Sequence, residues 1–201
     1  MAMGSCRALA LAAIVALSSG FCVLPTARPF REASSYCRGA CVATDGDVLY
    51  RPGQPGDEVL IASTMFKEKM NPLGIKHARF IVATDAAGTT LGFGQIRELG
   101  ADGALWELAS LYVLEDWRGR GVGSELARRL LSGHEAAGRA LSALYLLTLE
   151  PTTPFYETFG FRSARSEEVP KEMALEVAAG TALSFVLGNK LVCMRHAGSA
   201  D

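Results

Sequence analysis

The sequence predicts an α/β fold in which helices cover both faces of a mixed β-sheet. Three observations indicate this fold. The run from Leu105 to Leu114 is dense in Leu, Val, Tyr and Trp, as in a strand that is buried on both faces. A glycine-rich turn and an amphipathic helix follow it directly, with Leu126 and Leu130 on one helix face. Strand-like and helix-like segments also alternate from residue 45 to residue 196.

The segments on either side of this central strand are predicted from hydrophobic period and turn residues. Before it we expect a strand, a helix and a two-stranded hairpin, over Asp47–Arg51, Pro55–Met70, Phe80–Ala83 and Thr90–Arg97. After the helix that follows the central strand we expect a strand over Tyr145–Leu149 and then a very short helix that contains Pro154. A strand over Phe161–Ala164, a longer helix over Glu172–Leu187 and a last strand over Lys190–Arg195 complete the domain. The helix Glu172–Leu187 is apolar almost all round, so we expect it to lie deep against the sheet or in a homodimer contact.

Length and composition fit one folded domain with an extension. The chain has 201 residues, of which 49% are hydrophobic and 20% charged. Its formal net charge of −1 gives no reason to expect a general affinity for nucleic acid. Cys37 and Cys41 lack the spacing of a zinc site, and Cys193 is expected to be a small core residue, so no metal is predicted.

Residues 1–45 read as a cleavable targeting leader, and residues 46–196 as the folded domain. Arg7 precedes an apolar core from Ala8 to Leu17, and small residues follow, as in a signal peptide. The next segment is rich in Arg, Ser and Ala and poor in acids, as in a transit peptide. This arrangement resembles the bipartite leaders of algae with secondary plastids, which implies a plastid location. Simple secretion is the alternative.

The turn after the central strand has the composition of an anion cradle. Glycines let backbone amides point inward without a Cβ in the way. The N-terminus of the following helix adds N–H groups and a partial positive charge, and arginines add fixed charge that suits phosphate. The residues that form this cradle are Arg118, Gly119, Arg120, Gly121, Val122, Gly123 and Ser124.

Two common phosphate loops fit the turn poorly. A P-loop ends in Gly-Lys-Ser/Thr, whereas Gly123 is followed by Ser124 and Glu125. The dinucleotide fingerprint needs Gly or Ala where Ser124 stands, and its first glycine lies closer to the strand than Gly119 does. Neither a P-loop nor a dinucleotide-binding turn is therefore expected here.

The pattern Arg118-x-x-Gly121-x-Gly123, between an apolar strand and an amphipathic helix, resembles the pyrophosphate-binding motif of the GNAT superfamily of acyl-CoA N-acyltransferases. The segment Phe155–Phe161 resembles the second signature of that family. The two blocks occur in the family's order and at its spacing, and the resemblance covers roughly residues 45 to 196.

This resemblance implies a mostly antiparallel mixed sheet flanked by helices. It also implies transfer of an acetyl group from acetyl-CoA to a primary amine by direct attack, with no covalent enzyme intermediate. The acceptor would be a protein lysine, a protein N-terminus or a small amine, and the protein a monomer or a homodimer. The alternative is a catalytically inactive GNAT-fold module that binds CoA as a sensor or scaffold.

The resemblance also assigns roles to individual residues. Backbone groups of Leu111 and Val113 would contact the acetyl and pantetheine parts of the cofactor, and the Val113 amide would polarise the thioester carbonyl. The seven residues of the anion cradle would bind the pyrophosphate. Many family members carry an Asn after the next strand that contacts the CoA arm. Here no Asn is present, and Thr152 or Thr153 would take its place.

Glu107 and Tyr156 are the candidate catalytic residues. An alkylammonium has a pKa of about 10.4 and must lose a proton before it attacks. Glu107 is the one acid in the central apolar run, at the strand position where many family members carry a general base. A solvated strand-edge Glu, or one paired with an arginine, is the structural alternative. Tyr156 matches the tyrosine that family members use to protonate the departing sulfur, or it only packs beside Phe155.

Overall fold

The computed structural model describes residues 48–68, 70, 74–100, 102–174, 177 and 190–198. Each strand and helix predicted within these residues is present, with ends that differ by a few positions. The strands are β1 (Leu49–Pro52), β2 (Phe80–Thr84), β3 (Thr90–Leu99), β4 (Leu105–Val113), β5 (Leu144–Leu149), β6 (Phe161–Ser163) and β7 (Leu191–His196). The helices are α2 (Asp57–Lys67), α3 (Val122–Ala136) and α4 (Thr153–Glu157).

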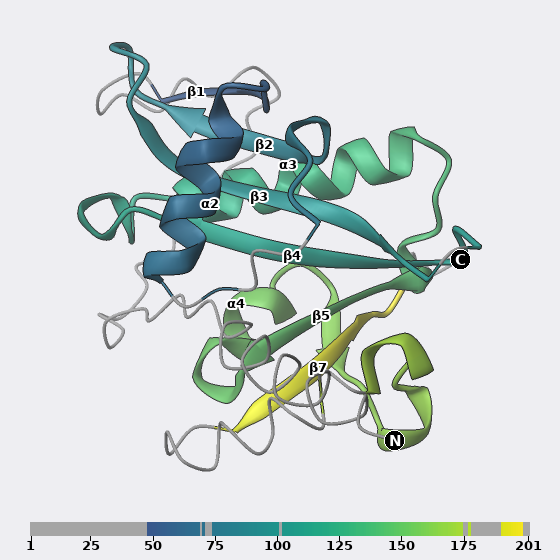
Figure 1. Cartoon of the computed structure of the whole chain (residues 1–201). Coiled ribbons are helices and arrows are strands. Elements are labelled where there is room, and N and C mark those ends of the chain that lie inside the picture. The colour runs from purple at the N-terminus through teal and green to yellow at the C-terminus, as the bar shows by residue number, and fades with distance from the viewer. Residues whose placement is uncertain are drawn as a thin grey trace, which may run out of the picture.

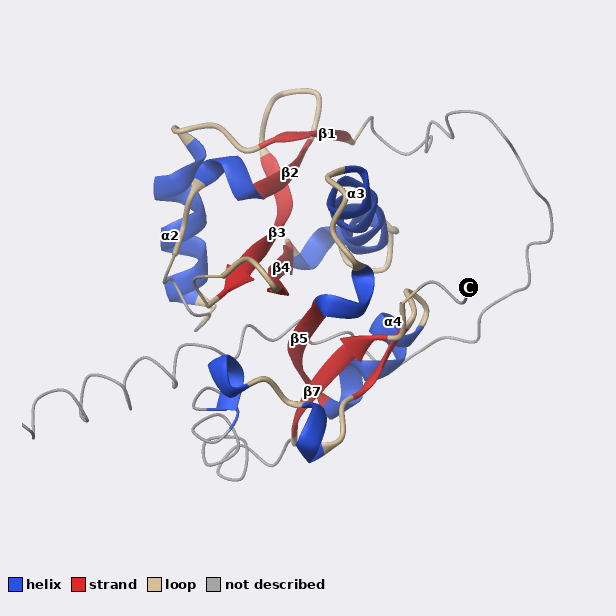
Figure 2. Ribbon diagram, turned by 90° about the vertical axis from the view of Figure 1, so that its right-hand side faces the viewer, coloured by secondary structure: helices blue, strands red, loops and turns tan. Residues whose placement is uncertain are grey.

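The described strands form one seven-stranded sheet in the order β1-β2-β3-β4-β5-β7-β6. Neighbouring strands run antiparallel except β4 and β5, which are parallel. A parallel pair needs a crossover, and α3 supplies it. Helix α2 lies on one face of the sheet, and α3 and α4 lie on the other (Figures 1 and 2). The predicted fold class, a mixed and mostly antiparallel sheet flanked by helices, is confirmed.

Each long helix buries one stripe of side chains against the sheet. On α3 the buried stripe includes Val122, Leu126, Leu130 and His134, which recur every fourth residue and so share one face. On α2, Ile61 and Met65 are buried in a cluster of their own against β2 and β3. Two aromatic rings in that cluster, Phe80 of β2 and Phe93 of β3, meet edge to face with centroids 5.9 Å apart.

Several predictions from the sequence lie outside the described residues. The leader is one, because the description starts at Val48. Most of the predicted helix Glu172–Leu187 is another, so its role in the core or in a dimer contact stays a prediction. Of the helices that the structure does describe, none is long and apolar enough to cross a membrane.

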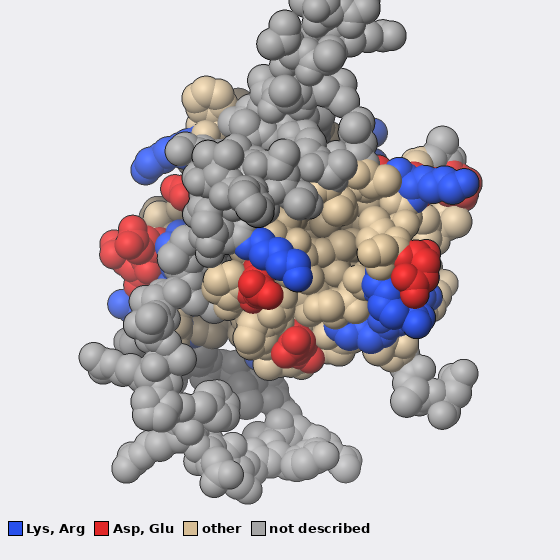
Figure 3. Space-filling view, turned by 90° about the horizontal axis from the view of Figure 1, so that it is seen from below, with Lys and Arg blue, Asp and Glu red and all other residues tan. Residues whose placement is uncertain are grey.

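Charged side chains on the described surface are mixed in sign where they gather. Viewed from below, basic groups lie next to acidic ones (Figure 3). Near the start of β6, for example, Arg162 and Glu168 form an ion pair with Nη2 and Oε1 2.6 Å apart. Charge on this part of the surface is therefore balanced locally.

The two buried histidines predict a loss of stability in mild acid. Burial lowers the pKa of both His134 and His196, although nearby backbone carbonyls partly oppose the shift. Below the ordinary histidine pKa of about 6.5, the unfolded chain binds protons that the folded chain does not, so the free energy of unfolding falls as pH falls. We expect urea midpoints to decrease from pH 7.5 to pH 5, and to decrease less in His134→Phe.

The acidic groups act in a lower pH range and can be separated from this effect. Ion pairs and hydrogen bonds lower the pKa of Asp57 and Asp85, so the stability that they add is lost only below their ordinary values near 4. A wild-type midpoint that stayed constant between pH 7.5 and pH 5 would contradict the prediction for the histidines.

Candidate active site

The sheet opens between its two central strands. Strands β4 and β5 pair only at Trp106–Leu144 and Glu107–Tyr145. Beyond these positions β4 continues to Val113 and β5 to Leu149 without pairing, and the two strands diverge (Figure 1). Backbone groups on the facing edges of both strands are thus left outside the sheet ladder.

A bulge in β4 accompanies this divergence. Ser110 has a positive φ of 56°, and the register between β3 and β4 shifts between Phe93 and Gln95. One extra residue in a strand reverses the alternation of side chains. Leu108 before the bulge and Leu111 after it therefore both belong to the core cluster that α3 covers.

The bulge also has a consequence for the backbone of Val113. The amide of the next residue, Leu114, donates to the carbonyl of Leu91 at 2.8 Å, on the β3 side. Amides alternate in direction along a strand, so the Val113 amide points the other way, toward the gap beside β5. The Val113 carbonyl faces that side too, where it accepts a hydrogen bond from Arg118 Nε at 2.9 Å. This direction is the one that the predicted carbonyl-polarising role requires.

The glycine–arginine loop lies where the gap meets the start of α3. Gly119 and Gly121 have φ of 75° and 85°, a left-handed conformation that favours glycine, and Gly121 is the N-cap of α3. The first helical hydrogen bond runs from the Glu125 amide to the Gly121 carbonyl at 3.0 Å, and no side chain caps the helix. The amides of Val122, Gly123 and Ser124 therefore have no helical acceptor and can receive an anion.

The two arginines of the loop are placed differently. Arg118 holds the loop to the end of β4 through its bond to the Val113 carbonyl. Arg120 is exposed, with its guanidinium 5.0 Å from the centre of the Trp117 ring. A stacked guanidinium keeps its N–H donors in plane and available, so Arg120 is the better placed of the two to meet a phosphate from solvent.

Glu107 is buried and forms an ion pair across the hairpin. Its side chain is opposite Arg97 of β3, whose Nε donates to Glu107 Oε2 at 2.6 Å, and the residue is only 5% exposed. The neighbours Trp106 and Leu108 both face α3, so Glu107 faces the other side of the sheet. The sequence left open whether this Glu pairs with an arginine, and in the structure it does. A hydrogen bond from a guanidinium favours the charged carboxylate.

Polar side chains and one thiol lie on the same face of the sheet as Glu107. Gln95 is fully buried, and its Nε2 donates to Ser110 Oγ at 3.2 Å. Burial and the negative charge of Glu107 raise the pKa of Cys193 to about 11, so this thiol stays protonated. Cys193 is thus a buried core residue, as predicted, and not a nucleophile.

Tyr156 lies on the opposite face of the sheet from Glu107. It sits on α4, is 9% exposed, and meets Phe155 and Phe161 edge to face at 5.0 and 6.2 Å. Tyr156 belongs to the α3-side core cluster together with Val113 and Val122. Phe155 brings α4 close to the loop, because a Cβ added at Gly123 would lie 3.8 Å from the Phe155 ring. The two candidate catalytic residues therefore flank the sheet from its two faces.

The threonines expected to replace the missing Asn have local roles. Thr152 Oγ1 donates to the Leu149 carbonyl at 2.7 Å, and Thr153 Oγ1 donates to the Glu150 carbonyl at 2.9 Å. These bonds use the hydroxyl protons to close the turn before α4. Thr152 Oγ1 also accepts from Thr148 Oγ1 at 2.5 Å, so Thr153 keeps more acceptor capacity for a CoA amide than Thr152 does.

Comparison with known proteins finds a match to one domain family. Residues 76–163 match the model of the acetyltransferase (GNAT) domain. In the part of the chain that the structure describes, no group of three or more His, Cys, Asp or Glu residues is arranged to hold a metal ion.

Solved structures share the fold at low sequence identity. One is N-acetylglutamate synthase from Neisseria gonorrhoeae, complexed with coenzyme A and N-acetyl-glutamate, with 18% identity over 76% of this chain and a TM-score of 0.52. The match covers 36% of that enzyme, so the chain spans about a third of its length. A Mycobacterium tuberculosis protein in complex with CoA matches at 21% identity over 73% of this chain and 98% of its own, with a TM-score of 0.52. A Staphylococcus aureus acetyltransferase of the GNAT family matches at 16% identity over 62% and 90%, with a TM-score of 0.51.

Three residues near the gap were not predicted from the sequence. They are Arg97, which bonds to Glu107, and the pair Gln95 and Ser110, which bond to each other on the same face of the sheet as Glu107. A signal for Arg97 was present, because counting outward from the turn Gly100–Gly103 places it directly across the hairpin from Glu107. No comparable signal marks Ser110, since a serine inside an apolar run does not reveal a bulge.

The loop predicts a charge-specific loss of cofactor affinity in Gly121→Asp. A Cβ at this glycine would meet no atom within 4 Å, so space is available, although the φ of 85° strains any other residue. Asp adds a carboxylate beside the pyrophosphate, a like-charge contact that costs several kcal/mol, so we expect affinity for acetyl-CoA to fall by at least about 100-fold in calorimetry.

Gly121→Asn is the matched control. Asn has nearly the same shape as Asp and similar tolerance of positive φ, but it has no charge. It should lose much less affinity than Asp at a similar melting temperature. Equal losses in the two variants would mean that backbone strain, not phosphate binding, explains the effect.

Proposed function

We propose that this GNAT domain transfers an acetyl group from acetyl-CoA to a primary amine by direct attack. The observation that carries the proposal is the gap between β4 and β5. It has an anion cradle at its mouth and a carboxylate and a phenol on its two sides. A thioester held in such a gap is reachable by an amine from one face, while its sulfur is reachable by a proton donor from the other.

The loop and the edge of β4 would bind and orient the cofactor. Amides at the start of α3, with Arg120 beside them, receive the pyrophosphate. The Val113 amide donates to the thioester oxygen, where negative charge develops as the amine attacks. Bound acetyl-CoA supplies the activated acetyl group, and the sheet edge supplies a fixed dipole that needs no rearrangement during the reaction.

Glu107 would accept the proton of the attacking amine. Its carboxylate attracts an ammonium group, takes one proton directly or through a water, and leaves a neutral amine facing the gap. Arg97 fixes the orientation of this carboxylate through the 2.6 Å bond and balances its charge in the sheet interior. Arg97 is therefore a positioning residue in this scheme.

Tyr156 would complete the transfer by protonating the leaving thiolate. Its phenol is on the α4 side, so the proton comes from the face opposite Glu107. The ammonium gives up one proton to Glu107 before it attacks, and its nitrogen loses a second proton to solvent after the N–C bond has formed. The C–S bond breaks and the thiolate gains a proton from Tyr156, so one proton is released overall in each turnover. Solvent exchange restores both groups before the next turnover.

The acceptor belongs to one of three classes: a protein lysine, a protein N-terminus or a small amine. A CoA-release assay over peptide and small-amine panels assigns the class. No CoA release with any amine, combined with micromolar acetyl-CoA binding, would favour the CoA-binding sensor instead.

Glu107→Gln should lower kcat by about 100-fold or more at neutral pH, with partial recovery at high pH, where free amine is abundant. The substitution keeps the side-chain shape and removes the proton acceptor. Arg97→Gln breaks the same ion pair but keeps the carboxylate, so it should retain more activity at neutral pH than Glu107→Gln. Stopped-time CoA release between pH 6.5 and 10 gives the profiles, and melting temperatures of both variants report the structural cost. A wild-type profile in Glu107→Gln would exclude Glu107 as the base.

Tyr156→Phe should lower kcat and leave acetyl-CoA binding nearly intact. The phenyl ring keeps the edge-to-face contacts with Phe155 and Phe161, and only the hydroxyl is lost. An interaction needed mainly in the transition state gives this pattern. Phe155→Leu is the control, because it alters packing beside the loop and should weaken cofactor binding more than chemistry. An unchanged kcat in Tyr156→Phe would assign the proton to solvent.

A further inference from the structure

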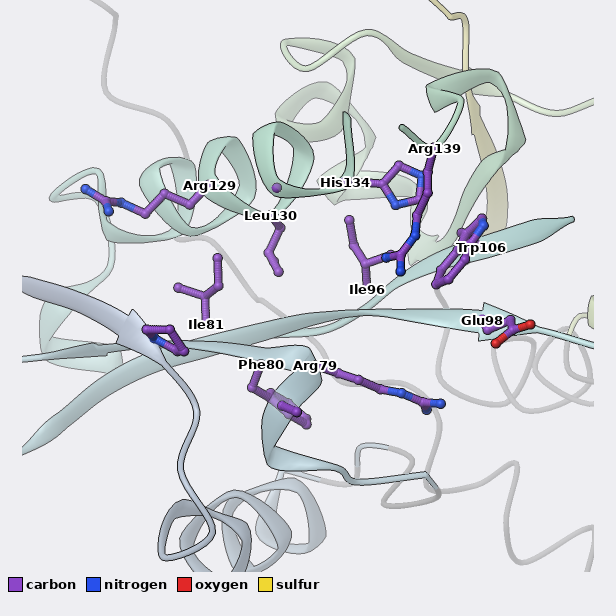
Figure 4. A pocket seen from close by; sticks show the side chains of 13 residues that line it. Arg79, Phe80, Ile81, Ile96, Glu98, Trp106, Arg129, Leu130, His134 and Arg139 are labelled. Carbon is purple, nitrogen blue, oxygen red and sulfur yellow. The ribbon is translucent and has the colours of Figure 1, made fainter. Parts of the chain in front are cut away.

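A cavity of about 470 Å³ lies beneath the second half of α3, away from the proposed active site. Residues of α3, of the strands β1 to β4 and of the turn before β2 line it, and it opens to solvent (Figure 4). Leu130, Gly133 and His134 line it from the helix. His134 is thirteen residues beyond Gly121, or about 20 Å along the helix axis at 1.5 Å per residue. The cavity is therefore separate from the loop that receives the pyrophosphate.

The cavity wall includes a buried imidazole. His134 is 3% exposed, and its ring lies near the Ala140 carbonyl without a hydrogen bond of good geometry. Its ring points into the cavity beside Arg139 (Figure 4). His134 is the polar member of a helix stripe that is otherwise apolar.

Three charged groups on the wall also lack partners of opposite charge. Arg79, Arg139 and Glu98 line the cavity, and none forms an ion pair with any residue that the structure describes. Arg139 extends from the loop after α3 toward Ile96 and Trp106, whereas Arg79 lies below the strands (Figure 4). The Arg139 guanidinium is 4.0 Å from the centre of the Trp106 ring, which orients it and leaves its edge donors available.

Trp106 itself is fixed within this wall. Its Nε1 donates to the Gly103 carbonyl at 3.1 Å, and its ring meets the His134 ring edge to face at 5.4 Å. Its side chain faces α3, on the opposite side of the sheet from Glu107.

We propose that this cavity binds a small organic carboxylate. Its anionic group would be received by the guanidinium of Arg139. Ile81, Ile96 and Leu130 offer an apolar wall for the body of the ligand. The size lies within the usual range for small-molecule sites, about 300–1,000 Å³. Glu98 on the same wall disfavours multiply charged phosphates, so a monocarboxylate fits best.

Calorimetry of the full chain without acetyl-CoA tests the proposal. The probes are benzoate and hexanoate, with benzamide as the uncharged analogue of benzoate and inorganic phosphate as an anion without an apolar body. We expect saturable binding of at least one carboxylate, and at least about tenfold weaker binding of benzamide and phosphate. No saturable binding of either carboxylate, or equal binding of benzoate and benzamide, would overturn the proposal.

Variants locate the binding. Arg139→Gln should weaken binding of the carboxylate by at least about tenfold. Arg128→Gln is the matched control, since this exposed arginine is on the same helix but does not line the cavity. Loss of binding in Arg128→Gln, or full binding in Arg139→Gln, would assign the probe to another surface. Acetyl-CoA affinity and melting temperature are measured in parallel, and Arg139→Gln should leave both unchanged, which separates this site from the proposed active site.

Discussion

The bulge at Ser110 is the constraint on which the arrangement of the site depends. It allows Leu108, Leu111 and Val113 to bury their side chains against α3, although Leu108 and Leu111 are three positions apart and would lie on opposite faces of a regular strand. The opposite strand accommodates it with glycine. A Cβ at Gly94 would lie 2.9 Å from Leu130 and 3.0 Å from Leu111, closer than real side chains allow. The bulge in β4 and the missing side chain in β3 are therefore one structural feature, and the direction of the Val113 amide follows from it.

The Glu107–Arg97 pair is better explained by function than by stability. Removing two charges from water costs several kcal/mol per ion, and replacing such a pair by apolar residues is often neutral or stabilising. Buried Gln95 lies on the same side of the sheet and leaves its Oε1 without a hydrogen bond. A sheet selected only for packing would have little reason to retain both features. Buried charges and unsatisfied polar atoms that do not improve packing are expected at functional sites.

Sequence reasoning recovered what depends on local pattern and missed what depends on register. The β4–loop–α3 unit was predicted because an apolar run, spaced glycines and a helical stripe each leave a local signal. The divergence of β4 from β5 leaves none, because residues on both sides of the last paired position are equally apolar. The Arg118 bond to the Val113 carbonyl could not be read either, since an arginine beside a phosphate-binding glycine is expected to meet the ligand and not the backbone.

Helix α3 departs from ordinary packing at both of its ends. At its start, glycine stands where a capping Ser, Thr, Asn or Asp would normally satisfy an amide, so several N–H groups are left facing the gap. In its last turns, His134 occupies the next position of the stripe formed by Val122, Leu126 and Leu130, where an apolar residue would pack without cost. Neither choice improves the helix by itself. The amides at its start face the gap, and its last turns border the cavity proposed for a carboxylate, so both ends of one rigid element are suited to ligands. The helix that organises the core would thus also support two separate binding sites.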